Sequence, residues 1–303
     1  MGILVVGSVA FDSVETPFGK VEEVLGGSGT YFSTSSSFFT EVKLVAVVGD
    51  DFPSEHLEFL RARKIDLSGL QTAPGRTFRW KGQYGFDLNE AHTLDTQLNV
   101  FATFRPRLPA GFEEAEIVFL ANIDPELQLE VLQQVRRPQL VACDTMNFWI
   151  EGKREALLKT LRHVDILLIN EGEARQLAGE ANLVKAARVI LGMGPKTLVI
   201  KRGEYGVLMF TAHAIFSAPA YPLEAVFDPT GAGDTFAGGF MGYLAASRDY
   251  SEAAMRKAIV FGSVMASFTV EDFSLRRLQS VVYSEIEDRY RKFQALTEFA
   301  GLD

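Results

Sequence analysis

The chain reads Asp-Pro-Thr-Gly-Ala-Gly-Asp-Thr-Phe-Ala-Gly-Gly-Phe at residues 228–240, a turn that becomes a helix. Pro229 cannot lie inside a helix or a central strand, so the preceding segment must end before it. Gly231 and Gly233 allow the backbone to approach a ligand without a Cβ in between. The aromatic residues that follow recur at helical spacing, which predicts a helix that begins close to Gly233.

The first backbone amides of this predicted helix come from a short loop. They belong to Gly231, Ala232, Gly233 and Asp234. Free N–H groups and the positive end of the helix dipole make such a loop a binding site for an anion. The Asp234 carboxylate lies beside it and can accept a proton. A base next to an anion site is what phosphoryl transfer to an alcohol requires, although a short glycine motif is also compatible with a simple helix cap.

Length and composition bound the class of protein. The 303 residues, 47% of them hydrophobic, suffice for one large α/β domain with a small appendage or for two modest domains. No apolar run approaches the roughly 18–20 residues of a membrane span, and the N-terminus has the pattern of a buried strand rather than a signal peptide. Cys143 is the only cysteine, which fits a reducing cytoplasm. The net charge of −9 argues against a nucleic-acid partner.

Short apolar runs alternate with amphipathic stretches through most of the chain. Buried strands are expected at 3–6, 44–48, 117–120, 140–143, 166–169 and 198–200, with an antiparallel edge at 207–210 and 214–216. Helices are expected between these strands, and then from Gly233, from Ser251 and from about Ser280 to the end of the chain. An early helix is expected to direct Leu57, Leu60 and Ile65 toward the core. The pattern predicts a mostly parallel sheet with helices on both faces.

Two segments depart from this alternation of apolar runs and amphipathic stretches. Residues of about 9–25 and 74–104 mix aromatic and polar side chains in the manner of half-exposed strands. We expect them to pair as one small sheet that stands off the main body. The aromatic side chains of its second segment include Phe78, Trp80, Tyr84 and Phe86.

The 228–240 stretch resembles the C-terminal signature of the ribokinase-like (PfkB-type) carbohydrate kinases, and the resemblance extends from Gly7 to about Val270. It implies a single domain, residues 1–303, with a three-layer αβα ribokinase-like fold and a small β-sheet lid that closes over the acceptor. It also implies an ATP-dependent kinase acting on a hydroxyl of a sugar, polyol or nucleoside. Asp234 would be the general base, and the amides of Gly231, Ala232 and Gly233 would stabilise the transferred phosphoryl group.

The same resemblance assigns an acceptor site. Asp12 and the pair Gly26-Gly27 match the segments that hold the sugar, together with Asp234. A carboxylate accepts hydrogen bonds from two hydroxyls, so Asp12 suits a polyol, although a hairpin turn explains it equally well. Tyr31 occupies the position where the family commonly has Asn. This departure leaves free sugar, inositol and adenosine-like nucleoside open as acceptors.

A second group of residues resembles the family's nucleotide site. Its members are Asp144, Asn170, Lys201, Gly203, Gly206 and Gly233. Lys201 replaces the usual Thr and either faces a phosphate or pairs with Glu204. Asn170 and Glu173 resemble the motif that holds Mg²⁺ through water, and their spacing also fits a capping box.

Further implications concern ions and partners. Asp228 and Thr230 match a site for a monovalent cation such as K⁺, while a loop aspartate and a helix-capping threonine explain the same spacing. The small-molecule acceptor and ATP are the expected partners, with neither nucleic acid nor membrane, and the lid offers a face for a homodimer. A catalytically silent sugar- or nucleotide-binding regulator on the same fold is the non-enzyme alternative.

Overall fold

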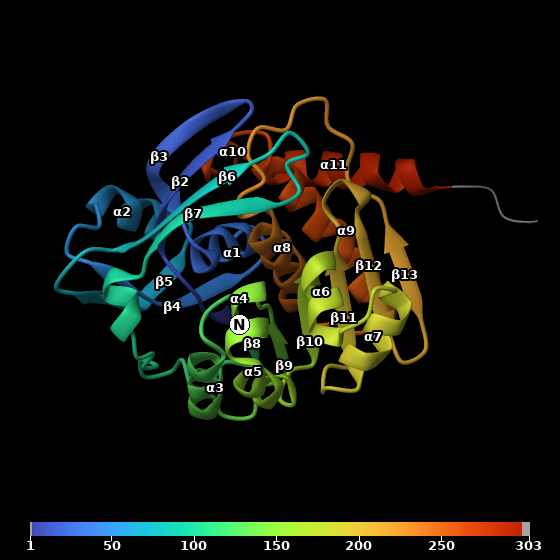
Figure 1. Ribbon diagram of the computed structural model, residues 1–303, viewed down its shortest axis with the longest axis horizontal. Helices are drawn as coiled ribbons and strands as arrows, with labels where there is room; N and C mark the ends of the chain where they lie inside the picture. Colours follow the sequence, from blue (N-terminus) through green and yellow to red (C-terminus); the bar gives the residue numbers. More distant parts are fainter. Residues whose placement is uncertain (1, 299–303) are drawn as a thin grey trace, which may run out of the picture.

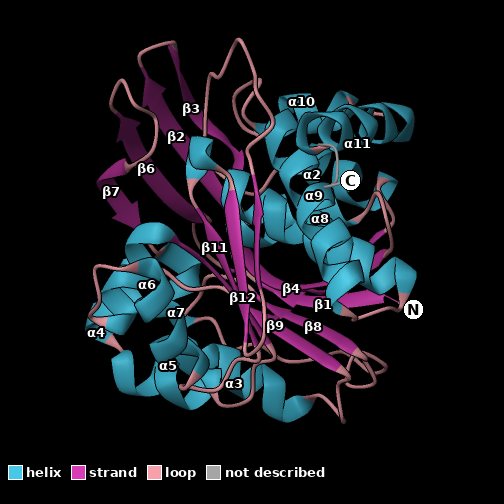
Figure 2. Cartoon of the chain, turned by 90° about the vertical axis from the view of Figure 1, so that its right-hand side faces the viewer, coloured by secondary structure: helices cyan, strands magenta, loops and turns pink. Residues whose placement is uncertain are grey.

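The computed structural model describes residues 2–298, which form a large sheet flanked by helices and a smaller sheet set apart from it (Figures 1 and 2). The large sheet contains β1 (Gly2–Val6), β4 (Glu41–Gly49), β5 (Ile65–Ala73), β8 (Ile117–Leu120), β9 (Leu140–Cys143), β10 (Ile166–Asn170), β11 (Thr197–Lys201), β12 (Val207–Thr211) and β13 (Ile215–Ala218). The helices are α1 (Ser28–Ser36), α2 (Ser54–Ala62), α3 (Pro125–Gln134), α4 (Asn147–Gly152), α5 (Arg154–Leu161), α6 (Glu171–Ala178), α7 (Leu183–Leu191), α8 (Ala232–Ser247), α9 (Glu252–Thr269), α10 (Arg276–Ser280) and α11 (Tyr283–Thr297). The last part of the predicted C-terminal helix lies outside the described residues.

The nine strands of the large sheet run in the order β13-β12-β11-β10-β9-β8-β1-β4-β5. All neighbours are parallel except at one edge, where β12 is antiparallel to both β11 and β13. The predicted mostly parallel sheet with an antiparallel edge is therefore confirmed. Because the central strands are parallel, their carboxyl ends gather at one rim, where open α/β sheets bind ligands.

Apolar side chains alternate across the large sheet and give it two separate cores. In β1, Ile3 and Val5 pack with α1, α8, α9 and α11, whereas Leu4 and Val6 pack with α3, α5, α6 and α7. Each residue of a strand points to the face opposite that of its neighbour, so a continuous apolar run serves both cores. The result is the predicted three-layer arrangement, visible edge-on in Figure 2.

The smaller sheet is the predicted lid. Its strands are β2 (Ala10–Thr16), β3 (Gly19–Gly26), β6 (Phe78–Tyr84) and β7 (Ala91–Gln97), in the order β3-β2-β6-β7. The prediction of strands up to residue 104 is wrong at its end, since Asn99–Thr103 form a 3₁₀ helix. Val100 is buried in the core of the main body there, and an isolated edge strand of the lid offers no such core.

The early helix is shorter than its apolar spacing predicted. The helix α2 ends at Ala62, and Lys64 takes a left-handed backbone conformation with φ of 59°. Ile65 is buried, as expected, but as the first residue of strand β5 beside β4 rather than on the helix. The spacing of apolar residues did not predict β5, because this segment becomes stable as a strand only by pairing with β4.

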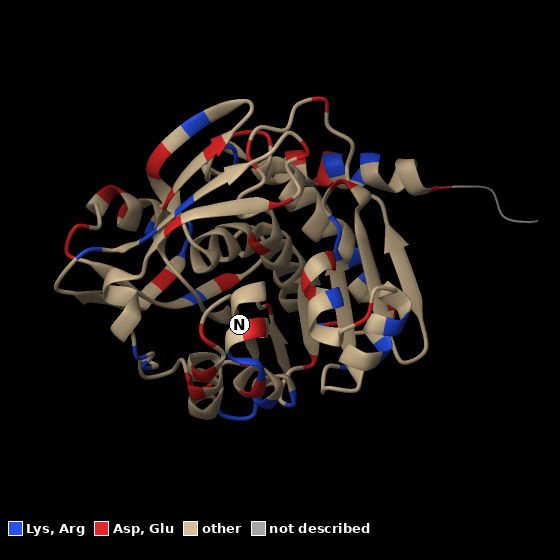
Figure 3. Cartoon of the chain, in the orientation of Figure 1, with Lys and Arg blue, Asp and Glu red and all other residues tan. Residues whose placement is uncertain are grey.

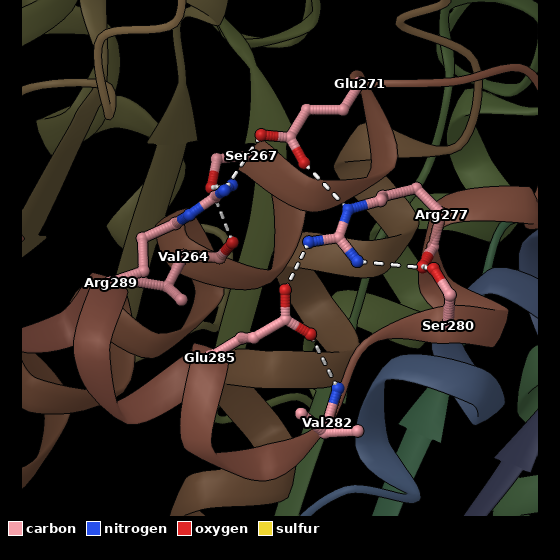
Figure 4. Close-up of polar contacts among 8 residues, drawn as sticks. All are labelled: Val264, Ser267, Glu271, Arg277, Ser280, Val282, Glu285 and Arg289. Carbon is pink, nitrogen blue, oxygen red and sulfur yellow. Dashed lines mark hydrogen bonds and ion pairs between the residues drawn. The ribbon is translucent and has the colours of Figure 1, made fainter.

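A cluster of ion pairs fixes the turn after α9 (Figure 4). Arg277 donates to Glu271 at 3.0 Å and to Glu285 at 2.7 Å, and Arg289 donates to the other oxygen of Glu271 at 2.8 Å. These contacts tie α9, α10 and α11 together around the intervening turn. The backbone N–H of Ser274 in this turn donates to Asp228, so the cluster also holds the segment that precedes α8.

Charged residues of both signs are interspersed along the chain, as Figure 3 shows. Within residues 2–298, no helix has both the length and the apolar character that crossing a membrane requires.

Candidate active site

The loop that precedes α8 is held by close contact with α1. Gly231 has φ of 73°, and a Cβ at this position would collide with the ring of Tyr31. Further along, the Ser35 hydroxyl donates to the carbonyl of Thr235 at 2.7 Å, and a Cβ on Gly238 would collide with the carbonyl of Phe32. Only glycine fits these places, so the N-terminus of α8 is fixed in position. The expectation that the Ala232 amide is free is wrong, because its N–H donates to the carbonyl of Pro229 at 3.1 Å and closes the turn.

The Asp234 carboxylate lies among charged groups. Desolvation raises its pKa to about 6, while the ammonium of Lys201 opposes that rise. Asp144, directly after β9, is 3% exposed, and burial together with the neighbouring Asp234 raises the pKa of its carboxyl well above the usual range. The Oδ1 atom of Asp144 has no hydrogen-bond partner among the described residues. Asp144 and Asp234 thus form a crowded acidic pair, a setting that produces a base poised near neutral pH.

Lys201 supplies positive charge to the loop. Lys201 is the last residue of β11. Its Nζ lies 2.9 Å from the position that a Cβ on Gly233 would occupy. Its charge acts on the carboxyls of Asp144, Glu173 and Asp234, and among residues 2–298 no ion pair joins it to Glu204. An ammonium above free helix amides favours an anion at the same place.

Asn170 and Glu173 form the predicted capping box at the start of α6. The backbone N–H of Asn170 donates to Glu173 Oε2 at 2.7 Å, and that of Glu173 donates to Asn170 Oδ1 at 2.8 Å. The Glu173 carboxylate also faces the site. Desolvation raises its pKa, Lys201 lowers it and Asp234 raises it again. The capping role of Glu173 is therefore confirmed, and the Glu173 carboxylate still lies close to Lys201.

Asp12 belongs to the lid strand β2 and is close enough to Asp234 to feel its charge. Its carboxylate accepts the N–H of Gly27, and a Cβ on Gly26 would collide with it. Burial raises the pKa of Asp12 to about 7, and Asp228 and Asp234 add to the rise. The predicted acceptor residues are therefore brought together next to the base.

Aromatic residues from two elements close this side. Tyr31 is 1% exposed, and its hydroxyl has no hydrogen-bond partner among the described residues. The Tyr84 hydroxyl contacts Thr230 Oγ1 at 3.2 Å, so the lid reaches the loop before α8. Trp80 is the register partner of Asp12 and shares its face of the lid. Phe86 belongs to the lid, in the loop between β6 and β7, but its side chain is 87% exposed.

The two glycines after β11 have different surroundings. A Cβ on Gly203 would collide with Asn89 of the loop between β6 and β7, so the tip of the lid lies against the predicted nucleotide side. A Cβ on Gly206 would collide with the carbonyl of Ala218. Close packing against β13 explains Gly206 without a ligand.

Asp228 has a structural task in the loop. Its two carboxylate oxygens accept the N–H groups of Thr230, at 2.9 Å, and Ser274, at 3.2 Å. Desolvation raises the pKa of this buried group. These two hydrogen bonds suffice to explain the conformation of the loop. The monovalent-cation site stays a prediction.

Sequence reasoning missed a polar cluster beside the Gly26-Gly27 segment. Ser8 and Ser28 exchange hydrogen bonds between backbone and hydroxyl at 3.0 and 3.2 Å. The Ser28 hydroxyl also donates to the carbonyl of Asn122 at 3.4 Å. Asn122 follows the buried strand β8, as Asp144 follows β9, so the rule that polar residues past a parallel strand line the rim would have found it.

The chain has relatives of known activity. The family model of the pfkB family of carbohydrate kinases matches residues 3–280. The cytidine kinase of Thermococcus kodakarensis is 30% identical over 260 residues, which cover 83% of this chain and 91% of that protein. The nucleoside kinase of Methanocaldococcus jannaschii is 28% identical, with coverage of 76% and 73%.

Solved structures share the fold. The crystal structure of the M. jannaschii nucleoside kinase matches with a TM-score of 0.76 and 22% identity, covering 96% of this chain and 98% of that one. The ribokinase of Thermotoga maritima matches with a TM-score of 0.75 and 22% identity, covering 95% and 99%. An E. coli protein solved in complex with ATP and Mg²⁺ matches with a TM-score of 0.75 and 17% identity, covering 96% and 99%. From the family match and the fold together, the chain belongs to the pfkB family of carbohydrate kinases, phosphotransferases whose acceptor is a hydroxyl group.

Proposed function

We propose that this kinase transfers the γ-phosphate of ATP to a hydroxyl of a nucleoside. One observation carries the choice of acceptor: Asp12, a carboxylate suited to ribose hydroxyls, shares a face of the lid with Trp80, whose ring lies over Gly82 and donates to Thr93 of β7. A nucleoside joins a polyol ring to a flat aromatic base and fits both features. The cytidine and nucleoside kinases among the relatives support the same acceptor class.

The residues around Asp234 define the chemical step. Asp234 accepts the proton of the acceptor hydroxyl while the hydroxyl oxygen bonds to the γ-phosphorus. The bond from that phosphorus to the bridging oxygen breaks, and ADP leaves. The amides at the start of α8 and the ammonium of Lys201, which lies at Gly233, would stabilise the negative charge that grows on the phosphoryl oxygens, and preorganised donors of this kind lower the activation barrier.

The lid excludes water, which is a competing acceptor. Tyr84 contacts Thr230 at the loop before α8, and Asn89 lies against Gly203 on the nucleotide side. The lid therefore spans both halves of the site, so its closure would shield the hydroxyl and the phosphate together.

The oxygen-rich donor set fits Mg²⁺. Glu173 and Asp144 carry carboxylate oxygens near Lys201 and Asp234, and Asp144 Oδ1 is unpartnered. Mg²⁺ bound with a nucleotide takes most of its ligands from phosphates and water, so it needs few ligands from the protein. When bound with the nucleotide, Mg²⁺ would neutralise charge on the phosphate oxygens. Asn170 and Glu173 would orient its water shell.

Glu173→Gln separates this role from the capping box. Glutamine keeps an oxygen that can accept the N–H of Asn170, so we expect the thermal midpoint to change little. Loss of the carboxylate charge should raise the Mg²⁺ concentration for half-maximal activity by about tenfold or more. A Mg²⁺ titration of initial rates measures this.

Glu171→Gln is the control, because Glu171 pairs with Arg175 and Arg202 instead of facing Asp234. A Glu173→Gln enzyme that loses thermal stability with unchanged Mg²⁺ dependence would show that Glu173 is a capping residue alone.

An acceptor panel tests the proposed function. With ATP and Mg²⁺ present, we expect cytidine, uridine, adenosine or inosine to give a kcat/KM at least about tenfold above that of ribose or inositol, because a missing base leaves its contacts unmade. Coupled ADP release measures all acceptors in one format. A preference for a free sugar would contradict the nucleoside acceptor, and absence of turnover with every acceptor would favour a silent binding protein.

A further inference from the structure

The side chain of Asn122 has its orientation fixed by a neighbour. The indole Nε1–H of Trp149 donates to Asn122 Oδ1 at 3.0 Å. An indole nitrogen can only donate, so the atom facing it must be the amide oxygen. The amide nitrogen of Asn122 therefore points away from Trp149. The amide cannot be turned over, because that would place its N–H groups against the indole N–H.

The amide nitrogen has a poor partner. Nδ2 donates to the thioether sulfur of Met146 at 3.2 Å, and within residues 2–298 it makes no other hydrogen bond. A thioether is a weak acceptor, and a half-buried donor that lacks a good acceptor costs free energy. Holding Trp149 requires only the oxygen. The two N–H groups are thus available to a better acceptor than sulfur.

Asn122 lies beside the acceptor residues. Its carbonyl accepts from the Ser28 hydroxyl, and Ser28 directly follows Gly27, whose N–H donates to Asp12. Phe148 packs edge-on against Trp149, with ring centroids 4.8 Å apart, and is 62% exposed. Donor groups next to an exposed aromatic surface are what a nucleobase requires for hydrogen bonding and stacking.

We propose that Asn122 determines acceptor specificity: its Nδ2–H groups donate to a carbonyl oxygen or an unprotonated ring nitrogen of the nucleobase. This inference rests on the nucleoside acceptor proposed above. Trp149 is a positioning residue, because it acts by orienting the amide. Bases that offer such an acceptor atom are selected over aromatic rings that offer none, since a site built to donate rejects a ligand that leaves its donors unpaired.

A double-mutant cycle between enzyme and substrate tests this. The enzymes are wild type and Asn122→Ala, and the acceptors are cytidine and phenyl riboside, whose ring has no hydrogen-bond acceptor. For wild type we expect kcat/KM to favour cytidine by about tenfold or more, and Asn122→Ala should remove that preference while leaving phenyl riboside nearly unaffected. Trp149→Phe keeps the ring but loses the indole N–H, and should reduce the preference partly.

Asn182→Ala is the matched control: it removes the N-cap of α7, remote from this cluster, and should leave the preference unchanged. Equal losses for both acceptors in Asn122→Ala would mean general damage and would overturn the inference. A wild-type enzyme that uses both ribosides equally would overturn it while leaving the nucleoside acceptor in place. Turnover of free ribose with neither riboside accepted would overturn the proposed function and this inference together.

Discussion

Asp234→Asn is expected to lower kcat by about 10²–10⁴-fold while the affinity for ATP changes little. Asparagine keeps the size and most hydrogen bonding of the side chain but cannot accept the proton of the acceptor hydroxyl. Steady-state kinetics with a saturating acceptor measure the loss, and calorimetric titration with a non-hydrolysable ATP analogue measures nucleotide affinity.

The pH dependence gives a second signature of the same base. Desolvation raises the pKa of Asp234 to about 6, and only the ionised carboxylate can accept a proton. With a saturating acceptor, so that protonation of Asp12 near pH 7 does not limit acceptor binding, the kcat of the wild type should therefore fall as pH drops through about 6, and the kcat of Asp234→Asn should lack this acidic limb. Asp249→Asn, at an exposed position before α9, is the control. Turnover close to wild type in Asp234→Asn would remove Asp234 from the mechanism.

Lys201→Met is expected to lower kcat by about 10²–10³-fold, the range for removing a charge-stabilising donor from a transition state. The Lys201 ammonium lies at Gly233, beside the amides that receive the phosphoryl group. Methionine has similar length and no charge. Lys201→Thr introduces the residue that the resembling motif usually carries, and we expect it to recover part of the activity through its hydroxyl.

The acidic limb also reports on Lys201, because its charge lowers the pKa of Asp234. Without the ammonium the limb should move to higher pH, which a purely structural role would not produce. Arg202→Met removes a neighbouring charge that pairs with Glu171 and should leave kcat nearly unchanged. An increase in the KM for ATP with unchanged kcat in Lys201→Met would show that Lys201 binds ATP in the ground state only.

Local sequence pattern was sufficient for much of the fold. The buried strands 3–6 and 117–120 and the turn-to-helix stretch at 228–240 were predicted from neighbouring residues, because alternation, apolar runs and glycine placement act within a few residues. The two elements that were predicted wrongly share one physical cause. Strand β5 and the 3₁₀ helix at 99–103 depend on partners distant in the chain, against which Ile65 and Val100 become buried.

The candidate site also contains features that adjacent residues predict and features that depend on distant ones. The turn into the helix at 231–234, the proposed base Asp234 and the capping box of Asn170 and Glu173 were predictable from the sequence, since each is a motif of adjacent residues. The sequence also placed Asp144 and Lys201 at one rim, because parallel strands end together.

The contacts between side chains that are distant in the chain could be known only from the three-dimensional packing. This packing brought the ring of Tyr31 under Gly231, Lys201 over Gly233 and the lid hydroxyl of Tyr84 to Thr230, and it joined Asn122 to Trp149. These contacts follow from the packing of α1 against α8 and from the position of the lid. Such packing is set by the shapes of whole elements, to which residues far apart in sequence contribute together.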